Sequence, residues 1–256
     1  MQHLSEITLD RIRIRNGWGL VVRDDLLEGG TKQRAIVPYL KRLKQQGFDE
    51  FVYASPFSGF AQVALASALQ YIDFKCTVFC EPTLLGEKHR FSALAEKMGA
   101  TVLLCDDLED ADFRAKQYES QSSGRLQLPL GFNDERYREE LSNAVDDLWA
   151  KAIAHRSPKN LWLPVGSGTL AQVFRNIVDK NIQLQCVDVH VLKEDDDRIE
   201  KLRGLDNLVL RSAPLKFQEE CRANCPIPSN LHYDSKVYEV FRDEAEDGDI
   251  WWNVAR

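Results

Sequence analysis

Residues 21–34 read VVRDDLLEGGTKQR, and this stretch decides how the rest of the chain is interpreted. A short apolar run passes into charged residues, a double glycine and Lys32, just ahead of helical apolar spacing that begins near Ala35. The glycine pair permits positive φ angles and close approach of the backbone to a ligand. A lysine at a helix start lies near other positive charge, which favours the neutral, nucleophilic amine. Taken alone, a Gly-Gly-x-Lys stretch is more often a surface turn.

Length and composition are those of an ordinary soluble protein. The 256 residues can form one large or two small domains, and 44% of them are hydrophobic. The net charge of −7 argues against binding nucleic acid mainly by phosphate neutralisation, although it leaves room for a local basic groove. No apolar run approaches the ~18 residues of a membrane helix. The first residues lack the basic start and apolar core of a signal peptide, so we expect a cytoplasmic protein.

The six cysteines are scattered, and most of them lie in strand-like apolar runs. Free, buried thiols in a reducing compartment explain this distribution better than disulfides. Cys221 and Cys225 are the one closely spaced pair, and no further Cys or His cluster accompanies them. We therefore expect no metal site.

Strand-like and helix-like stretches alternate along the chain, which predicts an α/β fold of parallel-rich sheet flanked by helices. We expect two lobes, a small one at residues 38–140 and a large one made of residues 1–37 and 141–256, with the ligand site at the carboxyl ends of the strands. The predicted strands are 51–55, 75–80, 101–105, 160–165 and 183–191, and the predicted helices begin near residues 35, 61, 86, 137 and 169.

Three less regular regions complete the prediction. Short apolar runs within residues 7–22 are typical of edge strands that wrap a core. Residues 117–131 are polar and contain glycine and serine, which indicates a connection back to the large lobe. The acidic run at residues 194–197 is typical of a solvated loop, because like charges repel and stay hydrated.

Residues 164–171 read PVGSGTLA, directly after a predicted buried strand and directly before a predicted helix. Gly166 and Gly168 let successive N–H groups converge, while Ser167 and Thr169 add hydroxyl donors. With the helix N-terminus, these groups form an anion cradle sized for one phosphate. The stretch lacks the Walker lysine and the third glycine of a dinucleotide fingerprint, so a plain βα turn is the alternative.

A second strand-to-helix loop lies at residues 58–62, which read SGFAQ. Backbone N–H groups in such a loop can hold a carboxylate, and the hydroxyl of Ser58 can donate or relay a proton. Lys32, this loop and the phosphate loop follow one another in the order that a phosphorylated aldehyde cofactor requires.

On these residues the sequence resembles the fold type II pyridoxal-phosphate enzymes, the tryptophan synthase beta-like group. The resemblance covers nearly the whole chain in a shortened form and is nearest the D-cysteine desulfhydrase and 1-aminocyclopropane-1-carboxylate deaminase branch. Residues 23–34 look like the family's RDDL…GGNKxR segment, whose lysine carries the cofactor. Residues 58–61, 166–170, 233–236 and 249–255 look like its substrate-serine, phosphate-loop, tyrosine and closing-strand segments.

The resemblance implies a cofactor, pyridoxal 5′-phosphate, bound as an aldimine of Lys32, and catalytic roles for Lys32, Ser58 and Tyr233. It implies a small amino-acid substrate and a homodimer, which is usual in the family. The residues that it places at the cofactor are Lys32, Gly59, Gly166, Ser167, Gly168, Thr169 and, beside the pyridine nitrogen, Asn253.

This chain departs from the family pattern at several of these positions. Thr31 and Gly59 each replace an asparagine, Phe60 replaces a histidine, and the chain is shorter than typical members. Three functions therefore stay open. The first is a lyase or deaminase acting at the α or β carbon of a small amino acid. The second is a phage-type enzyme that decarboxylates or eliminates an amino-acid adduct on a hypermodified thymine base in DNA. The third is a non-catalytic binding module that keeps the fold.

Overall fold

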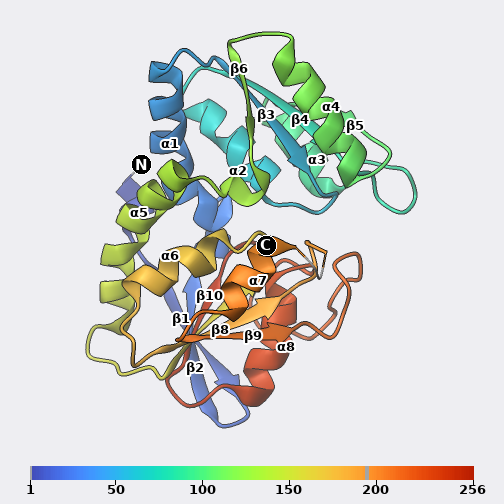
Figure 1. Ribbon diagram of the computed structural model, residues 1–256. Helices are drawn as coiled ribbons and strands as arrows, with labels where there is room; N and C mark the ends of the chain where they lie inside the picture. The colour runs from blue at the N-terminus through green and yellow to red at the C-terminus, as the bar shows by residue number, and fades with distance from the viewer. Residues whose placement is uncertain (1, 194–195) are drawn as a thin grey trace. The chain divides into compact units, whose positions relative to one another are not determined.

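The computed structural model describes residues 2–193 and 196–256, and the chain divides into two compact units. One unit combines Met1–Thr31 with Leu141–Arg256, and the other is Lys32–Glu140. The first boundary therefore falls after Thr31, whereas the sequence placed it after residue 37. Each unit is built on its own sheet (Figure 1).

The unit of residues 32–140 has a four-stranded sheet in the order β5-β4-β3-β6, in which all pairs are parallel. Helix α4 packs on one face, where Ala111 and Ala115 join a cluster with Val52 and Phe79. Helix α2 packs on β3 and β4 and contacts α1 and α3. The elements are α1 (Gln33–Gln45), β3 (Glu50–Ser55), α2 (Ala61–Ser67), β4 (Lys75–Cys80), α3 (Arg90–Lys97), β5 (Thr101–Leu104), α4 (Leu108–Ser120) and β6 (Arg125–Leu128).

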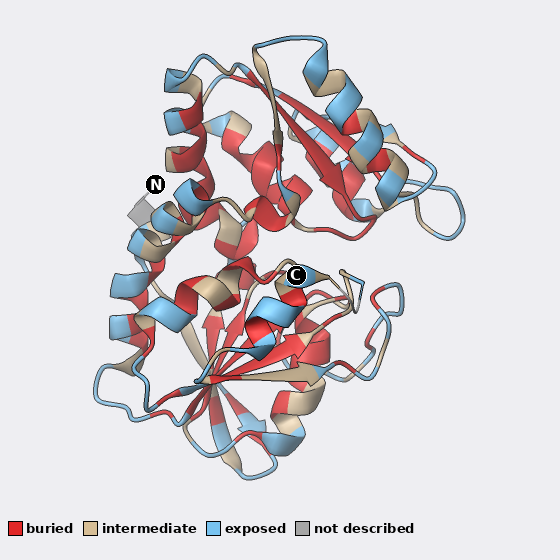
Figure 2. Ribbon diagram, viewed as in Figure 1, coloured by how far each residue is buried: buried red, intermediate tan, exposed pale blue. Residues whose placement is uncertain are grey.

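The other unit has a six-stranded sheet in the order β1-β2-β10-β7-β8-β9, and only its β1–β2 pair is antiparallel among the described strands. Helix α8 covers one face and α6 packs on β7 and β8. Figure 2 shows the buried strands at the centre of each sheet. The elements are β1 (Leu9–Ile14), β2 (Gly17–Arg23), β7 (Asn160–Val165), α6 (Thr169–Ile177), β8 (Gln183–Asp188), α7 (Asp197–Arg203), β9 (Leu208–Ser212), α8 (Asp234–Glu244) and β10 (Ile250–Asn253). Helix α5 (Glu135–Ile153) begins in the unit of residues 32–140 and continues into this one.

Strand β10, the last strand along the sequence, lies inside the sheet between β2 and β7. Its side chains alternate between two buried faces, which suits a central strand. Trp251 packs on Tyr238 and Phe241 of α8, with ring centroids 5.9 and 6.0 Å away. Trp252 points to the other face and lies 4.7 Å from the ring of Phe174 in α6. The two tryptophans therefore serve core packing.

Two parts of the predicted organisation are wrong. Residues 117–131 are not a polar connection, because α4 extends to Ser120 and β6 pairs in parallel with β3. The helix was missed because its buried face consists of little more than two alanines one turn apart. The run at residues 20–22 is not an edge strand either, since β2 lies between β1 and β10. Strand β9 and helix α8 were not predicted at all.

The acidic run was also interpreted incorrectly where the structure describes it. Glu194 and Asp195 lie outside the described residues, whereas Asp196 caps helix α7. Its carboxylate accepts from the backbone N–H of Arg198 at 2.9 Å and pairs with the guanidinium of that residue at 2.8 Å. This hydrogen-bonded pair lowers the pKa of Asp196 to about 2.

The cysteines are free, as predicted, and all except Cys225 are buried. No helix of the described chain is both long and apolar enough to cross a bilayer.

Candidate active site

Lys32 ends the short 3-10 turn Gly30–Lys32 and occupies the N-cap position of α1. Gly30 has a φ of 62°, which explains a glycine at this point of the stretch. The Lys32 side chain is partly buried, and its carbonyl accepts from the hydroxyl of Tyr137 at 3.3 Å. The lysine thus lies on a defined turn at a helix start, as the sequence indicated.

Thr31, the residue before the lysine, is buried in a network at the end of β10. Its N–H donates to the carbonyl of Val254 at 3.0 Å, and its hydroxyl oxygen accepts from the indole N–H of Trp252 at 3.0 Å. The same indole N–H donates to the carboxylate of Asp24 at 2.8 Å. The threonine that replaces the family's asparagine therefore fixes the backbone immediately before Lys32.

Ser58 and Gly59 lie between β3 and α2, at the carboxyl end of a parallel strand. Ser58 is fully buried, and its Oγ has no hydrogen-bond partner among the residues that the structure describes. A Cβ at Gly59 would lie 2.8 Å from the Oγ of Ser55 and 2.9 Å from the Cγ of Pro56. The N–H of Gly59 already donates to the carbonyl of Pro56 at 2.9 Å. An asparagine therefore does not fit at position 59, and this N–H is not available to a carboxylate.

Glu81 is a candidate that the sequence analysis missed. It follows β4 directly, and its carboxylate accepts from the N–H of Phe57 at 3.3 Å, one residue before Ser58. Burial raises the pKa of Glu81, which favours the protonated carboxyl group relative to an exposed glutamate. Its position after a parallel strand is the signal that would have found it.

The loop of residues 166–169 joins β7 to α6. Gly168 has a φ of 79° and forms the N-cap of α6, so a left-handed residue starts this helix. The hydroxyls of Ser167 and Thr169 are 2.9 Å apart. The N–H groups of Gly166, Ser167 and Gly168 donate to no residue in the described part of the chain. Free N–H groups, hydroxyls and a helix start thus lie together in this loop, and such groups can hold an anion.

Tyr233 lies directly against this loop. A Cβ at Gly166 would be 2.9 Å from the Cε1 of Tyr233 and 3.1 Å from its hydroxyl oxygen, so only glycine leaves room for the ring. Phe217 packs edge-on against the Tyr233 ring at 5.3 Å. The buried Lys236 donates to the carbonyl of Lys216 at 2.6 Å and so holds the segment that carries Phe217. The structure therefore brings together two predicted site residues that are far apart in sequence.

Asn253 ends β10, beside β2 and β7 at the carboxyl ends of those parallel strands. Its Nδ2 donates to the carbonyl of Pro228 at 2.9 Å, whereas its buried Oδ1 has no partner among the described residues. The carboxylate of Asp234 accepts from the N–H groups of Val254 and Ala255 at 2.7 and 3.2 Å. Asp234, which the sequence analysis missed, fixes the chain just beyond Asn253.

Each unit thus holds part of the predicted set. Lys32, Ser58 and Gly59 lie at the starts of α1 and α2 in one unit. In the other unit, Tyr233 contacts the loop of residues 166–169, and Asn253 lies at the same edge of the sheet. Across residues 2–193 and 196–256, no group of three His, Cys, Asp or Glu side chains is arranged to hold a metal ion.

Comparison with known proteins identifies the fold. No protein-family model matches the sequence, and no curated protein matches it. Solved structures do match over almost the whole chain. An ACC deaminase homologue superposes with a TM-score of 0.74 at 15% identity, covering 98% of this chain and 89% of its own. The chain therefore has the fold type II architecture of pyridoxal-phosphate enzymes, as the resemblance predicted.

Two further structures with this fold are similar to the chain. Diaminopropionate ammonia lyase from Escherichia coli has a TM-score of 0.67 at 12% identity, with 94% of this chain and 80% of that chain covered. Threonine deaminase from T.th. has a TM-score of 0.67 at 16% identity, with 92% and 86% covered. At these identities the likeness establishes the fold alone.

The residues present fit pyridoxal phosphate. The cradle of residues 166–169 offers unpartnered N–H groups to a phosphate, and a Cβ at Gly166 would disturb the tyrosine packed on it. The buried oxygens of Ser58 and Asn253 lack partners in the described structure, and such atoms are costly unless a ligand or water satisfies them. In the unit of residues 32–140, Lys32 offers an amine on the turn before α1.

Proposed function

We propose that the protein is a pyridoxal-phosphate-dependent lyase or deaminase that acts at the α or β carbon of a small amino acid. The observation that carries the proposal is the loop of residues 166–169, with three unpartnered N–H groups at the end of a buried parallel strand. These N–H groups and the hydroxyls of Ser167 and Thr169 at a helix start suit a phosphate. The deaminases and the ammonia lyase that share the fold support the same class.

The proposed roles divide between binding and proton transfer. When bound, pyridoxal phosphate supplies an electron sink for negative charge at the substrate α carbon. Gly166, Ser167, Gly168 and Thr169 would bind the phosphate through N–H and hydroxyl donors. Asn253 would lie beside the pyridine nitrogen.

The proton-transfer roles fall to three side chains. Lys32 would hold the cofactor through its Nζ, and the same amine, once the amine of the substrate has displaced it, would take a proton from the substrate Cα or return it. The hydroxyl of Ser58 would bind the substrate carboxylate or relay a proton. The hydroxyl of Tyr233, whose ring packs against Gly166, would serve one of the same two roles. Glu81, with its raised pKa, would supply a carboxyl group that holds or releases a proton beside the Ser58 loop.

The first experiment asks whether Lys32 binds the cofactor. Protein mixed with pyridoxal phosphate should acquire a visible absorption band, and borohydride should abolish the band and leave the cofactor on Lys32 in a peptide mass map. Lys32→Ala should lose both signals. Lys41→Ala, at an exposed lysine on the same helix α1, should keep both.

The same experiment decides between the enzyme and the non-catalytic module. A protein that takes up no cofactor, or that carries the label equally on many lysines, would overturn the proposal. Once the labelled lysine is known, release of ammonia or sulfide from free serine, threonine or cysteine would test the substrate class. A holoenzyme that is inactive on every free amino acid but active on amino-acid-modified DNA would instead establish the phage-type function.

A further inference from the structure

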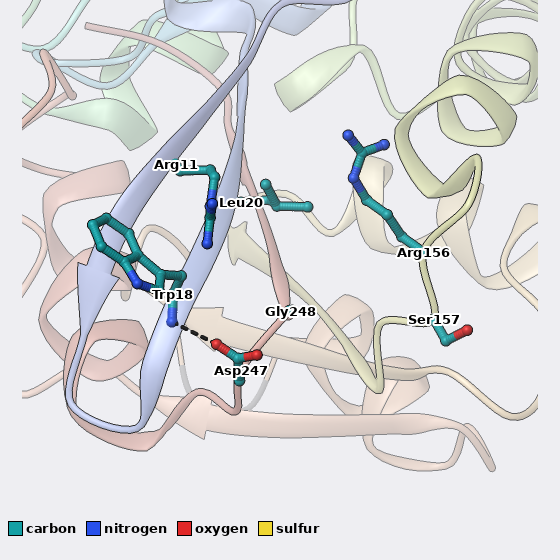
Figure 3. Close-up of a pocket in the computed structure, with 7 residues that line it drawn as sticks. All are labelled: Arg11, Trp18, Leu20, Arg156, Ser157, Asp247 and Gly248. Atoms are coloured by element: carbon teal, nitrogen blue, oxygen red, sulfur yellow. Dashed lines mark hydrogen bonds between the residues drawn. The ribbon is translucent and has the colours of Figure 1, made fainter.

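A second candidate site lies in the unit of residues 1–31 and 141–256. It lies at the amino ends of the parallel strands, whereas the loop of residues 166–169 lies at their carboxyl ends. A cavity of about 470 Å³ opens there, within the size range of small-ligand sites. Figure 3 shows Arg11 and Trp18 of the β1–β2 hairpin on one side of it, Arg156 and Ser157 on the other, and Leu20 between them. Asp247 and Gly248, just before β10, complete the lining.

The most unusual lining residue is Trp18, which is 42% exposed. The guanidinium carbons of Arg11 and Arg13 lie 4.9 and 5.5 Å from its ring centroid. These residues share one face of the hairpin, because Arg13 pairs with Trp18 and Arg11 pairs with Leu20 in the antiparallel register. The indole ring of Trp18 therefore lies beside two guanidinium groups and is still partly exposed to solvent.

The positive charge here is not neutralised. Within residues 2–193 and 196–256, neither Arg11 nor Arg13 nor Arg156 forms an ion pair, whereas Arg23 on the same hairpin pairs with Asp10 and Asp25. Arg156 uses one nitrogen to donate to the carbonyls of Ala152 and Ala154, at 3.1 and 3.2 Å. The one carboxylate in the lining, Asp247, accepts from the N–H of Trp18 at 2.8 Å. The lining therefore holds two arginines and one acid, and Arg13 adds a third guanidinium group beside Trp18, in a chain whose net charge is −7.

Each part of this arrangement is held by the fold. The carbonyl of Trp18 accepts from the N–H of Gly248 at 2.9 Å, and the N–H of Leu20 donates to the carbonyl of Asp249 at 2.9 Å. Gly17 has a φ of 143°, and a Cβ there would lie 2.2 Å from the Oδ1 of Asp247. The hairpin, the carboxylate and the start of β10 therefore form one pre-organised structure.

We propose that this cavity binds a nucleotide unit, either as a free mononucleotide or within a single nucleic-acid strand. A base stacks on the exposed indole and its guanidinium neighbours, and arginine with a serine hydroxyl binds the phosphate. The cavity lies at the amino ends of β7 and β10, whereas the proposed cofactor loop lies at the carboxyl end of β7. The two sites are therefore separate, and the inference does not rest on the proposed enzyme function.

Tryptophan fluorescence provides a direct test, because the other four tryptophans are buried. Adenosine 5′-monophosphate and a short oligothymidylate should quench Trp18 in a saturable way, and inorganic phosphate should bind more weakly because it cannot stack. Arg11→Gln with Arg156→Gln should raise the dissociation constant by about tenfold, since both arginines line the cavity and charge-assisted contacts to phosphate are lost. Arg222→Gln, at an exposed arginine of the same unit, should leave it unchanged.

The two ligand sources are distinguished by comparison. Tighter binding of the oligonucleotide with a steep salt dependence identifies a nucleic-acid strand, and equal or tighter binding of the mononucleotide identifies a free nucleotide. Gly166→Ala should not change either affinity, so failure of the cofactor proposal leaves this one intact. The absence of saturable quenching, or equal binding by the double variant, would overturn the proposal. The proposal would also be overturned if acrylamide did not quench Trp18 in the ligand-free protein, because a second copy of the chain would then cover this side chain.

Discussion

At the scale of single residues, two of the departures from the resembled pattern, at Gly59 and Thr31, have physical explanations. Gly59 is enforced by contact with Ser55 and Pro56, and Thr31 is part of the network that joins Trp252 to Asp24. These substitutions are therefore adaptations of the local packing around the site. They leave Lys32, Ser58 and the loop of residues 166–169 in place.

We predict that Thr31→Val lowers the free energy of unfolding by about 1 kcal/mol, because the buried indole N–H of Trp252 loses one of its two acceptors. Urea unfolding followed by fluorescence would measure the loss. Thr31→Ser keeps the hydroxyl oxygen and serves as the control, with a smaller loss. An equal loss in both variants would show that the methyl group, and not the hydrogen bond, stabilises this turn.

At the scale of elements, the loop between β7 and α6 is the part most sensitive to added volume. Gly166 is covered by Tyr233, and Gly168 needs a positive φ to start the helix. The strand, the loop and the helix start act together, because the N–H groups converge only if the chain turns within these four residues.

We predict that Gly166→Ala weakens the binding of pyridoxal phosphate by about tenfold and destabilises the fold by about 1–3 kcal/mol, the range for overpacking. The added Cβ would push the ring of Tyr233, which is 2.9 Å from the Cβ position. Cofactor titration by visible absorption gives the affinity. Gly204→Ala is the matched control, because its Cβ would meet no atom within 4 Å and its φ is −84°. Unchanged affinity in Gly166→Ala would mean that this loop does not bind the phosphate.

At the scale of the whole molecule, each unit carries a fully buried thiol on a central strand: Cys76 on β4 and Cys186 on β8. Burial raises the pKa of both thiols well above the ordinary value of 9.0. Above that value the unfolded chain loses these protons while the folded chain keeps them. Stability is therefore intact below pH 9 and falls as the pH rises further.

We predict that each of these thiols costs about 1.4 kcal/mol of folding free energy at pH 10 relative to pH 8. Lys236 acts in the opposite direction, since burial lowers its pKa to about 8 and the unfolded chain then binds the extra proton between pH 8 and 10.5. The measurement is therefore a difference between proteins. Urea unfolding under reducing conditions should show a smaller loss between pH 8 and pH 10 in Cys76→Ala with Cys186→Ala than in the wild type. An identical loss would mean that other groups control the alkaline transition.

The sequence by itself determined the α/β class, the alternation of strands and helices, and the strand-to-helix segments that carry Lys32, Ser58 and residues 166–169. These features depend on local periodicity, glycine placement and strand-to-helix order, which short stretches of sequence specify. The polar helix α4 and strand β6 were not predictable in this way, because their burial depends on a sheet formed by distant segments.

Only the tertiary structure decided which residues meet. The packing of Tyr233 on Gly166, the closure of the sheet by β10 between β2 and β7, and the gathering of Trp18, Arg11 and Arg156 around one cavity all join segments that are far apart in the chain or on different elements. Glu81 and Asp234 also acquired their roles only from partners brought by the fold. The physical reason is that hydrogen-bond satisfaction, burial and charge balance depend on the whole set of neighbours, and a linear sequence fixes only the nearest of them.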